Sequence, residues 1–121
     1  MDKQYLKENG DVDFEKFAPN DGKVPGTEIT DQTLNKGTII DRYGPSKGRY
    51  TSPDGTPYIE RSLPYQENPV AYHRYEVIKP INGVSMAKIA PAFGQDGGGT
   101  QYLLPKTVRW LLKNGFLREI K

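Results

Sequence analysis

Glycine and proline interrupt this chain too frequently for long regular elements to form. Thirteen glycines and ten prolines are distributed over its 121 residues. Proline fixes the backbone and removes a hydrogen-bond donor, whereas glycine permits conformations that are closed to other residues. A helical bundle is therefore excluded, and the length suits a single domain. We expect short elements joined by shaped turns.

The remaining composition indicates a folded domain with a small core. Hydrophobic residues make up 35% of the chain, and the mean hydropathy is -0.74. The eight tyrosines and four phenylalanines each bury a large area, which argues against disorder. No apolar run approaches the length of a membrane span, and the N-terminus lacks the apolar core of a signal peptide. We predict no membrane partner.

Charge and cysteine content exclude several classes of function. The formal net charge is only +2, and the basic residues are spread along the chain, so we predict no nucleic-acid partner. The absence of cysteine excludes disulfides, thiol nucleophiles and thiolate metal sites. His73 is the single histidine, which argues against a histidine-based metal site as well. We predict no metal and no cofactor.

The spacing of apolar and turn residues predicts an α+β fold. We expect a short helix over residues 13–17 and one or two helical turns over residues 30–37, between an Asp or Thr N-cap and Gly37. A longer helix is expected over residues 105–114, because Pro105 suits its first turn and Gly115 its end. Strands or extended pieces are expected over residues 39–43, 49–51, 58–63, 71–78, 84–89, 102–104 and 116–120. These elements predict a small N-terminal helical part on a bent, mostly antiparallel β core.

Two arginines follow or end extended segments, where a side chain can reach into a cleft. Arg42 lies in an Asp-Arg-Tyr-Gly run, and Arg61 precedes a Ser-Leu-Pro turn. An arginine in such a place can hold a phosphate with two hydrogen bonds. Taken alone, each is more commonly a structural ion-pair residue, and Arg42 has Asp41 or Glu60 as a possible partner. No nucleophile elbow or Walker A spacing is present.

Three consecutive glycines, Gly97, Gly98 and Gly99, form the most unusual segment. Each glycine loses much backbone entropy on folding, and a tight turn seldom needs three. The run is consistent with a backbone that closely approaches a pyrophosphate or nucleotide, or with a flexible surface linker. Sequence physics alone leaves both interpretations open.

Several motifs in order resemble one known family. They read DRYG, GRYTSPDGTPYIERSLP, YEVIKPI, IAPAFGQDGGGTQYLLP and LLKNGFL, and they resemble the TNT family, named for the tuberculosis necrotizing toxin. The resemblance extends from about Gly37 to Glu119, and nothing before Asn35 matches a family motif. It divides the chain into an N-terminal polar or helical segment, residues 1–34, and a TNT-like catalytic domain, residues 35–121.

This resemblance implies an NAD glycohydrolase, which hydrolyses NAD or NADP to nicotinamide and ADP-ribose. Family members are usually C-terminal modules of secreted toxins that act in the target-cell cytoplasm, where they deplete NAD. The producing cell neutralises them with a cognate immunity protein. Their fold resembles that of ADP-ribosylating toxins. Where the family frequently has an aromatic residue, this chain has Ala92.

The resemblance also implies site residues. Gln101 would hydrogen-bond the ribose hydroxyls or orient the attacking water, and Arg61 would hold a phosphate. His73, considered for its place in an expected strand and not for the resemblance, is a weaker catalytic candidate. Glu60 and Glu67 are the nearest candidates for a catalytic carboxylate, and nothing in the sequence favours one of them over the other. The expected substrate-binding residues are Arg42, Tyr43, Tyr50, Phe93, Gly97, Gly98 and Gly99.

Two other functions remain compatible with these residues. An ADP-ribosyltransferase would use the same substrate, but it would normally carry a glutamate where this chain has Gln101. A non-catalytic nucleotide- or protein-binding module could retain the scaffold, and release of free nicotinamide would separate it from both enzymes. An RNase is a weaker option, given one histidine and no basic patch.

Overall fold

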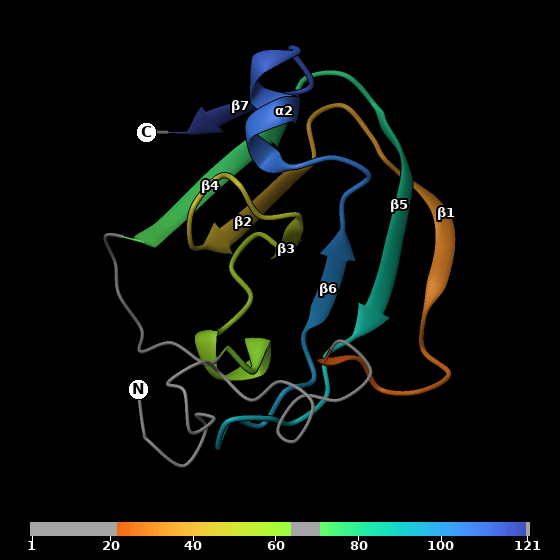
Figure 1. Cartoon of the computed structure of the whole chain (residues 1–121), viewed down its shortest axis with the longest axis vertical. Helices are drawn as coiled ribbons and strands as arrows, with labels where there is room; N and C mark the ends of the chain where they lie inside the picture. Colours follow the sequence, from red (N-terminus) through yellow and green to blue (C-terminus); the bar gives the residue numbers. More distant parts are fainter. Residues whose placement is uncertain (1–21, 64–70, 121) are drawn as a thin grey trace, which may run out of the picture.

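The computed structural model describes residues 22–63 and 71–120, and within them the fold is an antiparallel β-sheet with little helix (Figure 1). Seven strands are hydrogen-bonded in the order β1-β5-β6-β3-β2-β4-β7, and every pair is antiparallel. The elements are β1 (Ile29–Leu34), β2 (Ile39–Tyr43), β3 (Tyr50–Pro53), the 3₁₀ turn η3 (Tyr58–Arg61), β4 (Tyr72–Val77), β5 (Ile81–Lys88), β6 (Thr100–Leu103), α2 (Val108–Lys113) and β7 (Leu117–Ile120).

Strand β3 joins two halves of this sheet by pairing with a different neighbour at each end. Tyr50 and Thr51 pair with β6, whereas Ser52 and Pro53 pair with β2. One half therefore contains β1, β5 and β6, and the other contains β2, β4 and β7 (Figure 1). Residues that lie on β2 and β6 approach each other only across this four-residue strand.

The expected fold, with a small N-terminal helical part, is wrong. Residues 30–37, expected to be helical, form most of β1 and the turn after it. Strand β1 pairs with β5 through Gln32 opposite Val84 and Leu34 opposite Ile81, and this pairing overrides the local capping signals. Asp31, with φ of 55°, lies where the register shifts. The helix expected over residues 13–17 lies outside the described residues.

The core connects both halves of the sheet to α2. Thr107 caps α2 by accepting a hydrogen bond from the Trp110 backbone at 3.1 Å, which satisfies one of the free N–H groups at the helix start. The helix buries one apolar face and packs beside β7. The buried cluster consists of Leu34, Ile40, Tyr75, Val77, Ile81, Val84, Leu104, Val108, Leu111 and Leu117.

Candidate functional site

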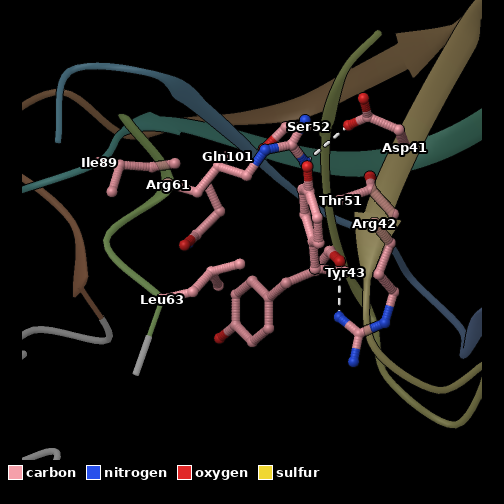
Figure 2. Close-up of a pocket in the computed structure, with 10 residues that line it drawn as sticks. Asp41, Arg42, Tyr43, Thr51, Ser52, Arg61, Leu63, Ile89 and Gln101 are labelled. Atoms are coloured by element: carbon pink, nitrogen blue, oxygen red, sulfur yellow. Dashed lines mark hydrogen bonds and ion pairs between the residues drawn. The ribbon is translucent and has the colours of Figure 1, made fainter. Parts of the chain in front are cut away.

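A small, open cleft lies where β3 passes between the two halves of the sheet (Figure 2). Its residues come from β2, β3, β6, the end of η3 and the segments beside them. It therefore gathers side chains that are up to sixty positions apart in the sequence. The residues that line this cleft are Asp41, Arg42, Tyr43, Tyr50, Thr51, Ser52, Arg61, Leu63, Ile89 and Gln101.

A fully buried carboxylate, Asp41, lies at the bottom of the cleft. Its Oδ1 atom is 2.7 Å from Nη1 of Arg61, and the two side chains are 0% and 4% exposed. Its Oδ2 atom accepts hydrogen bonds from the Tyr72 hydroxyl at 2.7 Å and from the Gly55 backbone at 3.0 Å. A buried charge is tolerated only when it is paired and hydrogen-bonded, and Asp41 meets both conditions.

Arg61 is held from two sides. Its Nε and Nη2 atoms donate to the Thr56 carbonyl at 3.0 and 2.7 Å, and its guanidinium carbon lies 4.9 Å from the centre of the Tyr43 ring. Such a cation–π contact adds to the ion pair with Asp41. Figure 2 shows Arg61 reaching toward Asp41, with Gln101 nearby. The guanidinium is thus fixed before any substrate enters.

Tyr72 stays protonated beside Asp41. Burial, the hydrogen bond to Asp41 and the negative charge of Asp41 raise the pKa of the Tyr72 hydroxyl to about 12. Desolvation and a nearby anion both oppose formation of the phenolate. Tyr72 therefore acts as a hydrogen-bond donor to the carboxylate at neutral pH.

Arg42 lines the cleft and also organises the loop after β2. It donates from Nε to the Pro45 carbonyl at 2.9 Å and from Nη1 to the Tyr50 carbonyl at 2.8 Å. The guanidinium passes so close to Gly48 that a Cβ atom there would lie 2.0 Å from Nη2. Gly48 is therefore required for this position of Arg42.

The other cleft residues of the predicted site come from both halves of the sheet. Gln101 lies on β6 opposite Ala87 of β5, and it borders both the cleft and a smaller adjoining hollow. Tyr50 is 40% exposed, whereas the Tyr43 ring packs between those of Tyr58 and Tyr72, at centroid distances of 5.0 and 4.9 Å. The structure thus brings together Arg42, Tyr43, Tyr50, Arg61 and Gln101.

The three glycines of the loop contact the protein's own backbone. Gly97 donates to the Ile59 carbonyl at 3.2 Å, and Gly99 donates to the Glu60 carbonyl at 3.1 Å. A Cβ atom on Gly97 would lie 2.7 Å from the Ala90 carbonyl, and one on Gly99 would lie 2.9 Å from the Glu60 carbonyl. Gly97, Gly98 and Gly99 are not among the residues that line the cleft, and the loop instead braces the segment that carries Arg61.

Phe93 and His73 also lie away from the cleft lining. Phe93 is buried, with a positive φ of 53°. His73 Nδ1 lies 2.9 Å from an oxygen of Glu119, and its ring stacks on Tyr75. Side chains alternate along a strand, so His73 lies on the opposite face of β4 from Tyr72.

Sequence reasoning missed Asp41 as a functional residue and treated it only as a surface partner of Arg42. The available signal was a carboxylate that directly follows Ile39 and Ile40, because a charge at a buried strand position requires a cationic partner. Of the two carboxylates considered instead, Glu60 lies in η3 and Glu67 lies outside the described residues.

Two negative findings concern the described part of the chain. It contains no group of three or more His, Cys, Asp or Glu side chains placed to hold a metal ion. None of its helices has the length and apolar character needed to cross a membrane.

Comparison with known sequences identifies relatives that are longer than this chain. The conidial surface nicotinamide adenine dinucleotide glycohydrolase nadA of Aspergillus fumigatus is 36% identical over 115 residues, which cover 86% of this chain and 49% of nadA. The outer membrane channel protein CpnT of Mycobacterium tuberculosis is 30% identical over 123 residues, which cover 88% of this chain and 14% of CpnT. The chain thus spans half or less of the length of these curated relatives.

Solved structures agree with the sequence matches. Tuberculosis necrotizing toxin, in complex with its immunity factor IFT, superposes with a TM-score of 0.65 at 25% identity, covering 93% of this chain and 65% of the toxin chain. Rhs1-CT, in complex with its cognate immunity protein RhsI1, shares the fold with a TM-score of 0.53 at 20% identity, covering 78% of this chain and 77% of its own. The sequence model of the tuberculosis necrotizing toxin family matches residues 33–120. This chain therefore belongs to the tuberculosis necrotizing toxin family.

Proposed function

We propose that this chain is an NAD glycohydrolase, which hydrolyses the bond between nicotinamide and ribose in NAD or NADP. Membership of the family and 36% identity to a protein named as an NAD glycohydrolase support this activity. The observation that carries the proposal is the cleft itself. The residues that the motifs single out converge there from β2, β3, η3 and β6, and they are Arg42, Tyr43, Tyr50, Arg61 and Gln101.

The reaction suits a cleft that works by positioning and electrostatics. Water attacks the ribosyl carbon as the carbon–nitrogen bond breaks, and the electron pair leaves with nicotinamide, which becomes neutral. One proton from the water passes to solvent, and ADP-ribose is released. Because the leaving group is already cationic, it needs no proton, unlike the leaving group of an ordinary glycosidase. The protein must hold the dinucleotide and stabilise the developing ribosyl cation.

The proposal assigns distinct roles to the residues of the cleft. Gln101 hydrogen-bonds the ribose hydroxyls or orients the attacking water, and Arg42 and Arg61 face the pyrophosphate. Tyr43 supports the Arg61 guanidinium from below, and the exposed Tyr50 ring offers a stacking surface for nicotinamide or adenine.

The predicted residues outside the cleft lining act in this proposal through the scaffold. The backbone bonds of Gly97 and Gly99 to Ile59 and Glu60 fix η3, and Gly98 and the buried Phe93 belong to the same loop. His73 acts through β4, whose Tyr72 binds Asp41.

We further propose that the chain works as the toxin module of a larger secreted protein and has a cognate immunity protein. The two solved structures named above are complexes of tuberculosis necrotizing toxin with its immunity factor and of Rhs1-CT with its cognate immunity protein. The curated relatives are a conidial surface protein and an outer membrane channel protein, and both extend well beyond the matched region. We expect it to act in the cytoplasm of the target cell, on the NAD present there. The reaction as written consumes only NAD and water, so the proposal includes no additional cofactor.

The test is quantification of nicotinamide and ADP-ribose after incubation of the purified chain with NAD or NADP. We expect equal amounts of the two products, and we expect Gln101→Ala to lower kcat by on the order of a hundredfold with a smaller change in KM, because the glutamine acts on the transition state. Gln32→Ala, a glutamine change on β1, serves as the matched control.

Other outcomes identify the competing functions. ADP-ribose that appears only attached to a macromolecule would indicate a transferase. Intact NAD with a folded, inhibitor-free chain would leave a binding module. A folded Gln101→Ala variant with full activity would remove Gln101 from the mechanism.

A further inference from the structure

We infer that Asp41 is a positioning residue for the proposed reaction, acting through Arg61. The inference rests on the proposed function, because it concerns how the cleft treats a dinucleotide. It assigns to Asp41 two effects on the Arg61 guanidinium: it fixes the orientation of the group, and it cancels its charge.

The carboxylate is held from three separate segments. Arg61 comes from η3, Tyr72 from β4, and Gly55 from the turn after β3. With one oxygen bound by Tyr72 and Gly55 and the other paired with Arg61, the group has no alternative orientation that satisfies all its partners. Asp41 is therefore a rigid reference point at the bottom of the cleft.

Asp41 supplies the second point that fixes the Arg61 plane. The two hydrogen bonds to Thr56 hold only the edge formed by Nε and Nη2. The 2.7 Å ion pair with Asp41 holds Nη1, the remaining nitrogen of the guanidinium.

Charge cancellation matters because the reaction builds up positive charge. The side chains of Asp41 and Arg61 are almost completely removed from water. Solvent therefore screens their charges poorly. An uncompensated Arg61 in the cleft that also holds Gln101 would repel the developing ribosyl cation, while still attracting the anionic pyrophosphate. Loss of the Asp41 charge should therefore impair turnover more than binding.

The experiment is a double-mutant cycle of Asp41→Asn and Arg61→Gln, followed by kcat, KM and the Kd for ADP-ribose. We expect Asp41→Asn to lower kcat by about tenfold or more, with the Kd for ADP-ribose changed by less than about threefold. In the Arg61→Gln background, Asp41→Asn should lower kcat/KM by less than about threefold further, since its target is absent.

A matched variant separates this role from the general effect of losing a carboxylate. Asp54→Asn removes a carboxylate from the exposed pair with Arg74, in which both side chains are more than a third exposed, and it should leave kcat unchanged. Equal losses of kcat/KM from Asp41→Asn in both backgrounds, or activity equal to that of Asp54→Asn, would overturn the inference.

Two further situations still give a decision. If Asp41→Asn fails to fold, the Arg61→Gln variant is compared with the double variant, in which the buried pair is neutral. We expect the two variants to have equal kcat/KM. A further tenfold loss of kcat/KM in the double variant would overturn the inference. If the unmodified chain releases no nicotinamide, the proposed function fails. Titration with ADP-ribose then tests the role of Asp41. Equal affinity of the Arg61→Gln variant and the double variant for ADP-ribose supports the inference. A lower affinity of the double variant, or no binding by any form of the chain, contradicts it.

Discussion

Substitution of single glycines in the loop of residues 97–99 can separate a structural role from a ligand-binding one. Gly97 has φ of 69° and Gly98 has φ of 95°, so alanine at either position adopts a strained backbone, at about 1 kcal/mol. A Cβ atom at Gly98 would meet nothing within 4 Å, whereas one at Gly97 would lie 2.7 Å from the Ala90 carbonyl carbon and oxygen and from the Ile89 oxygen. These backbone atoms cannot move aside without breaking the bonds that hold the loop.

The expected magnitudes follow from this difference. Gly98→Ala should lower the free energy of unfolding by about 1 kcal/mol, and Gly97→Ala by about 3 kcal/mol, since overpacking adds roughly 2 kcal/mol. For a domain of this size, 1 kcal/mol corresponds to about 4 °C in Tm. We therefore expect Tm to fall by about 4 °C and about 12 °C, respectively, in thermal unfolding followed by circular dichroism.

Equal Tm values for the two variants would refute the steric argument. A Gly97→Ala variant of unchanged stability that has lost affinity for ADP-ribose would instead show that the loop contacts the ligand. Gly55 has φ of 81°, and a Cβ atom added there would have no neighbour within 4 Å. Gly55→Ala therefore controls for backbone strain outside the loop.

Two further predictions concern the cleft. Thr51 is buried, and its Oγ1 atom has no hydrogen-bond partner among the described residues. Thr51→Val should therefore leave the free energy of unfolding unchanged or raise it by up to about 1 kcal/mol. A clear decrease of this free energy in chemical denaturation would reveal a partner for the hydroxyl. The pKa of Tyr72 is raised from 10.0 to about 12 in the folded protein, so its stabilisation is complete below pH 10 and is lost as the pH rises toward 12. The unmodified chain should lose more stability than Tyr72→Phe across this interval in equilibrium unfolding, and parallel curves would contradict the assignment.

Local signals predicted the elements whose ends are set by single residues. The strand expected over residues 71–78 is β4, bounded by Tyr72 and Val77. The helix expected over residues 105–114 is α2, which ends at Lys113, before Gly115 as expected, but begins only at Val108, after the Thr107 cap. Proline and glycine fix such ends through their own backbone preferences, so they are readable without knowledge of the partner. The same is true of the glycine loop, where a close backbone approach was one of the two interpretations left open.

The failures concern partners that are distant in the sequence. The segment of β1 carries helix-capping residues, and only its pairing with β5 makes it a strand. The glycine pattern could not say that the loop contacts η3. Asp41 precedes Arg61 by twenty positions, and nothing local indicates that β2 and η3 bury the two charges together. Such pairings depend on topology, which local propensity does not encode.

The division of β3 between two neighbours has a mechanical consequence. Asp41 belongs to the half of the sheet that contains β2, and Gln101 belongs to the half that contains β6. Their separation therefore depends on the twist of one short strand, together with the core cluster that packs against both halves. A small rotation about β3 would open or narrow the cleft while both halves keep their internal hydrogen bonds. Substitutions far from the cleft that alter this twist can thus change turnover without measurable loss of stability, and backbone amides of β3 are the place where hydrogen exchange would report such motion.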